Sequence, residues 1–205
     1  RLQGGDQSVG ARLQRVEGDS RADFVSEFAW SMGPIRESVE LTIPAHLVAQ
    51  ATRDNSRSRY DDHGPDLLHY AMRPCVVTDH LARTLRDQAV RHGLPAWQPP
   101  LLLVQSIPWI GDFYSTGRAD YWRYPIETLA DGGGDCEDLA ILTVALLRRL
   151  GEPAVFMGTD DHVGVGIARG PGGLTVQGVA YSYVDVSQSG AEPLRPHAHY
   201  RVLDR

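Results

Sequence analysis

The chain has 205 residues, a formal net charge of −6 at pH 7 and 42% apolar residues. This length predicts one domain of ordinary size, or a core with an added subdomain, and the apolar content is sufficient for a real core. The negative charge argues against nucleic acid as the main partner, because phosphate binding favours a basic surface. No apolar run reaches the roughly 18 residues of a membrane span. The chain begins at Arg1 rather than methionine, so we expect it to be part of a longer or processed protein.

The N-terminal part predicts a hairpin followed by a short helix. Residues 1–22 are polar and contain glycine, which favours a flexible lead-in. Apolar and polar residues then alternate in 23–30 and in 37–44, which predicts two antiparallel strands joined by a turn. A short helix over 45–53 is expected next, and 55–66 is expected to be a loop.

Two helices are predicted in the middle of the chain. The first covers 77–95, with Thr78 as N-cap, Gly93 as the stop, and an apolar side that comprises Leu81, Leu85 and Val90. The second lies within 98–109, has prolines near its start, and ends before Pro108. The stretch 110–134 is rich in tyrosine, tryptophan and glycine, and we expect it to be irregular; loops this long inside a domain are often functional.

The last part predicts a buried helix followed by strands. The helix runs from Cys136 to about Leu150 and is apolar nearly all round, so it should be central. Strands are expected over 153–158, 162–168 and 176–187. The predicted fold class is α+β, with the helix that carries the cysteine packed on an antiparallel sheet. We divide the chain into the lead-in, an N-terminal hairpin and helix extension over 23–69, and a core over 70–205.

Cys136 is the candidate nucleophile. It follows the glycine run 132–134 and a capping acid, Asp135, at the start of the central helix. A thiol at a helix N-terminus is favoured as the thiolate by unpaired N–H groups and the macrodipole. Glu137 and Asp138 would raise its pKa, so we expect them to point away and stabilise the first helical turn or bind loop N–H groups. The second cysteine, Cys75, is expected to be a buried small hydrophobe, and both thiols are expected to be free.

His162 and Asp185 complete a nucleophile, base and orienting acid in the order Cys, His, Asp. His162 opens the strand that follows the cysteine helix and one further strand, which favours it over His197 and His199 near the C-terminus. Strand alternation places Asp185 on one face with Tyr181 and Tyr183. The alternatives are a surface histidine and a solvated acid.

Four further residues are weaker candidates for completing or shaping the site. The backbone N–H of Cys136 and the side-chain amide of Gln105 could bind an oxyanion, although Gln105 could equally be a surface residue at a helix end. Trp109 and Tyr124, with other aromatic residues of the same stretch, either form the walls of a cleft or simply pack the loop. Asp135 shapes the start of the helix.

These motifs resemble the transglutaminase-like superfamily, the bacterial and archaeal branch of papain-like cysteine enzymes. The matching pieces are VQSIPW, YWRYPIETLADGGGDCEDLAILTVALLRRLG, DDHVGVGIA and YSYVDVSQSG, and they cover roughly residues 70–190. The resemblance implies a Cys136–His162–Asp185 triad on a papain-like core, to which the hairpin is an addition. It also implies that Glu127 and Thr128 shape the loop before the nucleophile. Such proteins are often extracytoplasmic or membrane-anchored, which would place any membrane attachment in a segment outside this chain.

The resemblance leaves the reaction open. The first expectation is a cysteine peptidase or amide hydrolase that acts on a peptide or isopeptide bond of a protein or peptide substrate. The alternatives are transglutaminase-type transfer to an amine, a non-catalytic peptide-binding module, and a metal site built on Cys136 and His162, for which the usual ligand spacing is absent. No cofactor is expected, although some relatives need calcium. The loop acids that could bind it are Asp112, Asp120, Asp131, Asp160 and Asp161.

Overall fold

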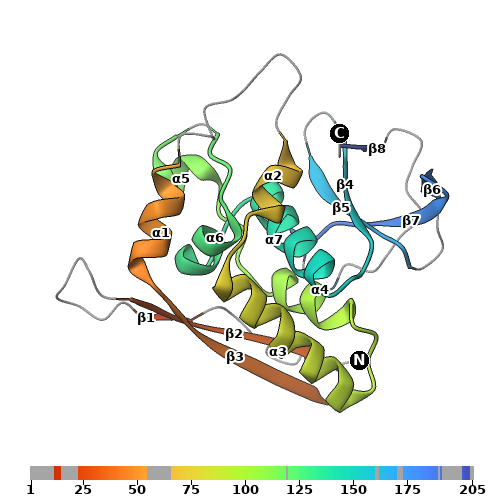
Figure 1. Cartoon of the computed structure of the whole chain (residues 1–205), viewed down its shortest axis with the longest axis horizontal. Helices are drawn as coiled ribbons and strands as arrows, with labels where there is room; N and C mark the ends of the chain where they lie inside the picture. The colour runs from red at the N-terminus through yellow and green to blue at the C-terminus, as the bar shows by residue number, and fades with distance from the viewer. Residues whose placement is uncertain are drawn as a thin grey trace, which may run out of the picture.

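In the computed structural model of the chain, the described residues are 12–14, 23–54, 66–118, 120–159, 162–169, 173–188, 190 and 200–203. They form two antiparallel sheets with helices between them (Figure 1). The α+β fold class is thereby confirmed. No helix within these ranges is both long enough and apolar enough to cross a membrane.

The first sheet has the order β1-β2-β3. Its strands are β1 (Arg12–Gln14), β2 (Phe24–Met32) and β3 (Ile35–Ile43). The predicted hairpin is confirmed, and β1 adds a strand from within the expected lead-in. Alternation buries Phe28, Trp30 and Leu41 in the same hydrophobic core as the central helix, so the hairpin shares the core of the whole fold.

Between β3 and residue 117, the described residues form helices that lead toward the candidate nucleophile. They are α1 (Ala45–Thr52), α2 (Leu67–Met72), α3 (Val76–His92), α4 (Gln98–Gln105) and α5 (Asp112–Thr116). Figure 1 shows α3 lying along the hairpin.

Two details of the predicted first long helix are wrong. It starts at Val76 with Cys75 as N-cap, so Thr78 lies inside the helix and is buried. Val90 is 76% exposed, because Gln88 and Ala89 occupy the buried face instead. Gln88 can be buried because its side-chain oxygen accepts a hydrogen bond from the indole of Trp30 at 2.9 Å.

The stretch expected to be irregular contains α5 and a further helix, α6 (Pro125–Asp131). Pro125 is its first residue, where a missing N–H costs nothing, and Gly132 ends it in the left-handed conformation with φ 63°. Three residues then lead to α7 (Cys136–Arg149), whose side chains are almost all buried. The central, buried helix is therefore confirmed.

The second sheet packs on α7 and has the order β6-β7-β5-β4-β8. Its strands are β4 (Ala154–Gly158), β5 (Val163–Ile167), β6 (Leu174–Val176), β7 (Val179–Val184) and β8 (Arg201–Val202). The single strand predicted over 176–187 is wrong. Gln177 and Gly178 both have positive φ, and this two-residue turn folds β6 back onto β7.

Candidate active site

Cys136 is the first residue of α7, and Asp135 stands at the N-cap position, as predicted, but its side chain makes no capping hydrogen bond. The backbone N–H of Val163, at the start of β5, points at the sulfur and lowers the pKa of the thiol. Burial and the neighbouring Glu137 act more strongly in the other direction and raise that pKa to about 12. Both cysteines, Cys75 and Cys136, are free thiols, as expected, and each is only half-buried.

The expectation that Glu137 points away from the thiol is wrong. The sulfur of Cys136 donates a hydrogen bond to Oε2 of Glu137 at 2.8 Å. A carboxylate in this position stabilises the protonated thiol by accepting its proton and destabilises the thiolate by charge repulsion. Asp138 does bind a loop N–H group, since its Oδ1 accepts a hydrogen bond from the backbone of Arg123 at 2.6 Å.

His162 and Asp185 lie together beside the start of β5. Nε2 of His162 is 3.1 Å from Oδ2 of Asp185, an ion-pair distance without the alignment of a hydrogen bond. Oδ1 of Asp185 accepts hydrogen bonds from the backbone and hydroxyl of Ser187 at 3.0 and 2.6 Å, and Gln188 donates to Oδ2 at 2.7 Å. Burial raises the pKa of Asp185, but the bonds from Ser187 and the charge of His162 outweigh it and hold that pKa below its usual value. The alternatives His197 and His199 lie outside the described residues.

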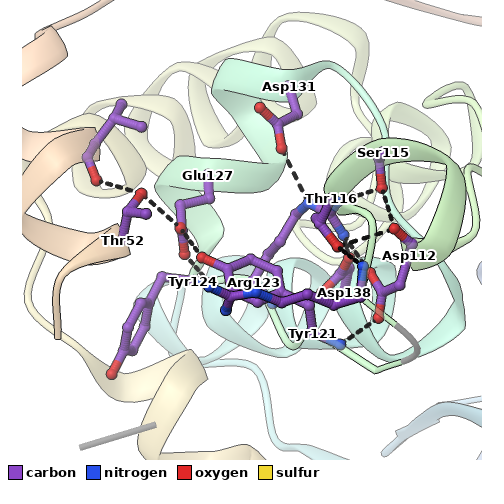
Figure 2. Close-up of polar contacts among 12 residues, drawn as sticks. Thr52, Asp112, Ser115, Thr116, Tyr121, Arg123, Tyr124, Glu127, Asp131 and Asp138 are labelled. Carbon is purple, nitrogen blue, oxygen red and sulfur yellow. Dashed lines mark hydrogen bonds and ion pairs between the residues drawn. The ribbon is translucent and has the colours of Figure 1, made fainter. Parts of the chain in front are cut away.

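A buried arginine organises the loop before the nucleophile (Figure 2). Arg123 is fully buried and forms ion pairs with Asp112 at 2.8 Å, Asp131 at 3.0 Å and Asp138. Its Nη2 also donates to the hydroxyl of Ser115 at 2.6 Å. Burial lowers the pKa of Arg123, and the charge of Asp138 with the other carboxylates more than compensates, so the guanidinium stays charged. Sequence reasoning missed this residue, although an arginine inside the run YWRYP, close to several acids, was a usable signal.

More carboxylates lie near the thiol of Cys136 than the single positive charge of Arg123 can neutralise. Asp135 is 8% exposed, and its Oδ1 is buried without a hydrogen-bond partner. Burial and the charges of Asp138, Glu137 and Asp112 raise the pKa of Asp135 to about 9. Burial also raises the pKa of Asp138, to about 7, although Arg123 opposes the shift.

Two overlapping groups of these acids have carboxylate oxygens within 4.8 Å of one another: Asp112, Asp120 and Glu137, and Asp112, Asp135 and Asp138. Within the described ranges, neither group includes Cys136 or His162, so a metal site built on the thiol and imidazole is not formed there. Asp160 and Asp161 fall outside those ranges.

Two of the three glycines in the run 132–134 lie in positions that leave no room for a side chain. A Cβ on Gly133 would lie 2.4 Å from Cδ1 of Ile110, and one on Gly134 would lie 2.6 Å from Cβ of Asp138. Gly134 also forms a parallel bridge with Trp109, in which the N–H of Ile110 donates to the Gly134 carbonyl at 2.9 Å. The segment around Trp109 is thereby fixed against the residues that precede the nucleophile.

Glu127 holds the start of α6 in place. Its carboxylate accepts hydrogen bonds from the backbone of Tyr124 at 2.9 Å, the hydroxyl of Tyr121 at 2.7 Å and the hydroxyl of Thr52 at 3.0 Å (Figure 2). The carbonyl of Thr128 accepts from the N–H of Gly132 at 3.0 Å and closes the turn that ends α6. Glu127 thus contacts the start of α6 and Thr128 the turn that ends it, and the role in shaping the loop before the nucleophile stays a prediction.

The remaining candidates separate into buried and exposed residues. Tyr124 is fully buried, its ring is stacked on Tyr70 with centroids 4.7 Å apart, and its hydroxyl donates to Asp54 at 3.0 Å. It packs the interior and also lines a pocket with Cys75 and Ile126. Gln105 is buried at the end of α4, which packs against α7. Trp109, by contrast, is 57% exposed beside the glycine loop.

Three solved structures share part of the fold of this chain. Calcium-bound LapG from Legionella pneumophila is 18% identical, with a TM-score of 0.42 over 67% of this chain and 80% of LapG. A proposed cysteine protease from Cytophaga hutchinsonii is 15% identical, with a TM-score of 0.38 over 77% of this chain and 56% of that one. A TGase is 11% identical, with a TM-score of 0.37 over 84% of this chain and 47% of that one. No family model and no curated protein matches the sequence.

Proposed function

We propose that the chain is a thiol-dependent acyl-transfer enzyme, a cysteine peptidase or amide hydrolase, with Cys136 as nucleophile, His162 as base and Asp185 as the residue that orients it. The observation that supports this most is that Nε2 of His162 lies 3.1 Å from Oδ2 of Asp185. The next residue in the chain, Val163, directs its backbone N–H at the Cys136 sulfur. A carboxylate beside one imidazole nitrogen fixes the tautomer and supports the imidazolium.

In the proposed mechanism the two imidazole nitrogens of His162 have different roles. Since Nε2 of His162 faces Asp185, Nδ1 is the nitrogen that takes the thiol proton. The sulfur of Cys136 then forms a bond to the substrate carbonyl carbon, and the negative charge develops on the carbonyl oxygen near the helix N-terminus. The C–N bond breaks as Nδ1–H gives its proton to the leaving amine. Water, deprotonated by the same nitrogen, releases the acid and restores the thiol.

Catalytic variants with a matched histidine control test this proposal. The probe is a pool of peptides released from a denatured bacterial lysate by a protease of known specificity, incubated with the protein in buffer that contains calcium chloride. We expect Cys136→Ala and His162→Ala to lose cleavage by about 10²-fold or more, while His80→Ala, an exposed histidine on α3, keeps it. Cleavage that survives in Cys136→Ala would reject the proposal. Incorporation of a fluorescent primary amine in place of cleavage would identify transglutaminase-type transfer.

We also propose that the carboxylates beside Cys136 bind calcium. The residues fit a hard cation, because Asp112, Asp120 and Glu137 bring carboxylate oxygens within 4.8 Å of one another and the buried Oδ1 of Asp135 has no partner. A dication bound there would offset the charge that raises the pKa of Asp135.

Thermal unfolding with calcium chloride and with EGTA tests the cation site. A cation that binds only the folded state raises Tm with concentration, so we expect calcium to raise Tm of the wild type. Asp112→Asn and Asp135→Asn should lose most of this increase, while Asp87→Asn, an exposed acid on α3, should retain it. An equal calcium effect in all four proteins would contradict binding at this cluster.

A further inference from the structure

Exposed aromatic side chains gather on one short segment next to Cys136. Trp109 is 57% exposed, Phe113 69% and Tyr114 88%, and we call these three residues the aromatic ridge. Over the part of the chain that the structure describes, the other large apolar side chains with comparable exposure are aliphatic and lie on α2 and α3. Exposed aromatic side chains that gather on one segment of a soluble protein are typical of contact sites.

The position of the aromatic ridge relative to the nucleophile is fixed by backbone contacts. Trp109 bridges Gly134, which lies two residues before Cys136, and Ile110 donates to the Gly134 carbonyl at 2.9 Å. Gly133 leaves no room for a side chain against Ile110, since a Cβ there would lie 2.4 Å from Cδ1. The ridge therefore belongs to the rim of the candidate active site.

Hydrogen bonds to Asp112 and Ser115 hold in place the short helix α5, which carries Phe113 and Tyr114. Asp112 is 4% exposed and accepts a hydrogen bond from the Arg123 guanidinium at 2.8 Å as well as one from the Tyr121 backbone. Arg123 also donates to the hydroxyl of Ser115 at 2.6 Å. The two aromatic rings, with centroids 6.0 Å apart in an edge-to-face arrangement, thus project from an anchored base.

We propose that the aromatic ridge determines substrate specificity by binding apolar side chains of an extended protein segment whose scissile bond lies at Cys136. This inference rests on the proposed acyl-transfer function. The side chain of Tyr114 is almost fully exposed, so an extended substrate segment can lie against it. Rigid aromatic side chains provide large contact area at low entropic cost. Contacts made by parts of the substrate away from the scissile bond position that bond for attack by the thiol.

Cleavage-site profiling with the same lysate-derived peptide pool tests this inference. Sequencing of the products from the wild type should show enrichment of aromatic and large aliphatic residues at one or more positions within about four residues of the cut bond, the reach of an extended chain across the ridge. A Trp109→Ser, Phe113→Ser, Tyr114→Ser triple variant should lose this enrichment, and kcat/KM for the best peptide should fall by about tenfold or more. Val90→Ser, which removes an exposed apolar side chain on α3, is the matched control and should match the wild type.

The outcomes distinguish failure of the inference about the aromatic ridge from failure of the proposed acyl-transfer function. Cleavage without apolar enrichment, or enrichment that persists in the triple variant, would overturn the ridge inference and leave the thiol enzyme standing. Absence of Cys136-dependent cleavage would remove both. Because the three side chains are exposed, Tm of the triple variant should match that of the wild type, which separates loss of specificity from loss of fold.

Discussion

The thiol of Cys136 donates a hydrogen bond at 2.8 Å to the carboxylate of Glu137, its neighbour in the chain. This contact opposes the favourable effect of the helix N-terminus. Burial, and after it this contact, raises the pKa of the thiol to about 12. Glu137 is also one of the acids whose oxygens lie close to those of Asp112 and Asp120. The nucleophile and the candidate cation site therefore share a residue.

Replacing Glu137 should make the thiol more reactive. In Glu137→Gln the negative charge is gone, so the pKa of Cys136 should fall and alkylation by iodoacetamide near neutral pH should be faster in calcium-free buffer. Peptide mapping across a pH series measures the rate at Cys136 separately from Cys75. Glu27→Gln, an exposed acid on β2, is the control and should label like the wild type. A slower or unchanged rate in Glu137→Gln would contradict the role assigned to the carboxylate.

Arg123 should be among the residues on which the fold depends most. Arg123→Met removes the positive charge and leaves Asp112 and Asp138 buried beside each other. Breaking a buried ion pair in this way costs about 3–5 kcal/mol of unfolding free energy. Urea denaturation should show this loss, and the double variant Arg123→Met, Asp138→Asn should recover part of it. Equal stability of the single and double variants would argue that the charge of Asp138 is not what makes the arginine necessary.

Gly134→Ala should disturb both the acid cluster and the aromatic ridge. The new Cβ would lie 2.6 Å from Cβ of Asp138 and 2.8 Å from its Oδ2, and Asp138 is held by Arg123. Overpacking of this kind costs about 1–3 kcal/mol. We expect lower stability in urea together with a lower rate of peptide cleavage. A variant as stable and as active as the wild type would show that the loop relaxes without consequence.

Glu37 should link the hairpin to α3 in a pH-dependent manner. The hydrogen bond from His92, with the charge and hydrogen bond of Arg91, outweighs burial and lowers the pKa of Glu37 in the folded state. Since the unfolded chain holds this proton more tightly, the stabilisation is present above the ordinary glutamate pKa of about 4.3 and is lost as the pH falls through the lower folded value. Glu37→Gln should therefore unfold at lower urea concentration than the wild type at pH 7, and the difference should shrink toward pH 3. Glu40→Gln, an exposed acid on the same strand, should show no such difference.

Local patterns in the sequence were sufficient to predict much of the fold. Alternation in 23–44 predicts the β2–β3 hairpin, and the apolar run after Cys136 predicts the buried α7, because burial of one face or all faces leaves a period in the chain. The break between β6 and β7 was missed, because Gln177 adopts a positive φ that the residue type does not signal. The exposure of Val90 was missed because a buried hydrogen bond between Trp30 and Gln88 decides which face of α3 is covered.

The sequence by itself determined the candidate chemistry, since a cysteine after a glycine run, a histidine at a strand start and an acid in an aromatic strand are identified by type and order. Only the tertiary structure decided the electrostatics around them. It brought Nε2 of His162 to 3.1 Å from Asp185, turned Glu137 toward the thiol and buried Arg123 among three carboxylates. The pKa shifts of these groups depend on the distances between them and on burial, and neither is encoded in local sequence pattern.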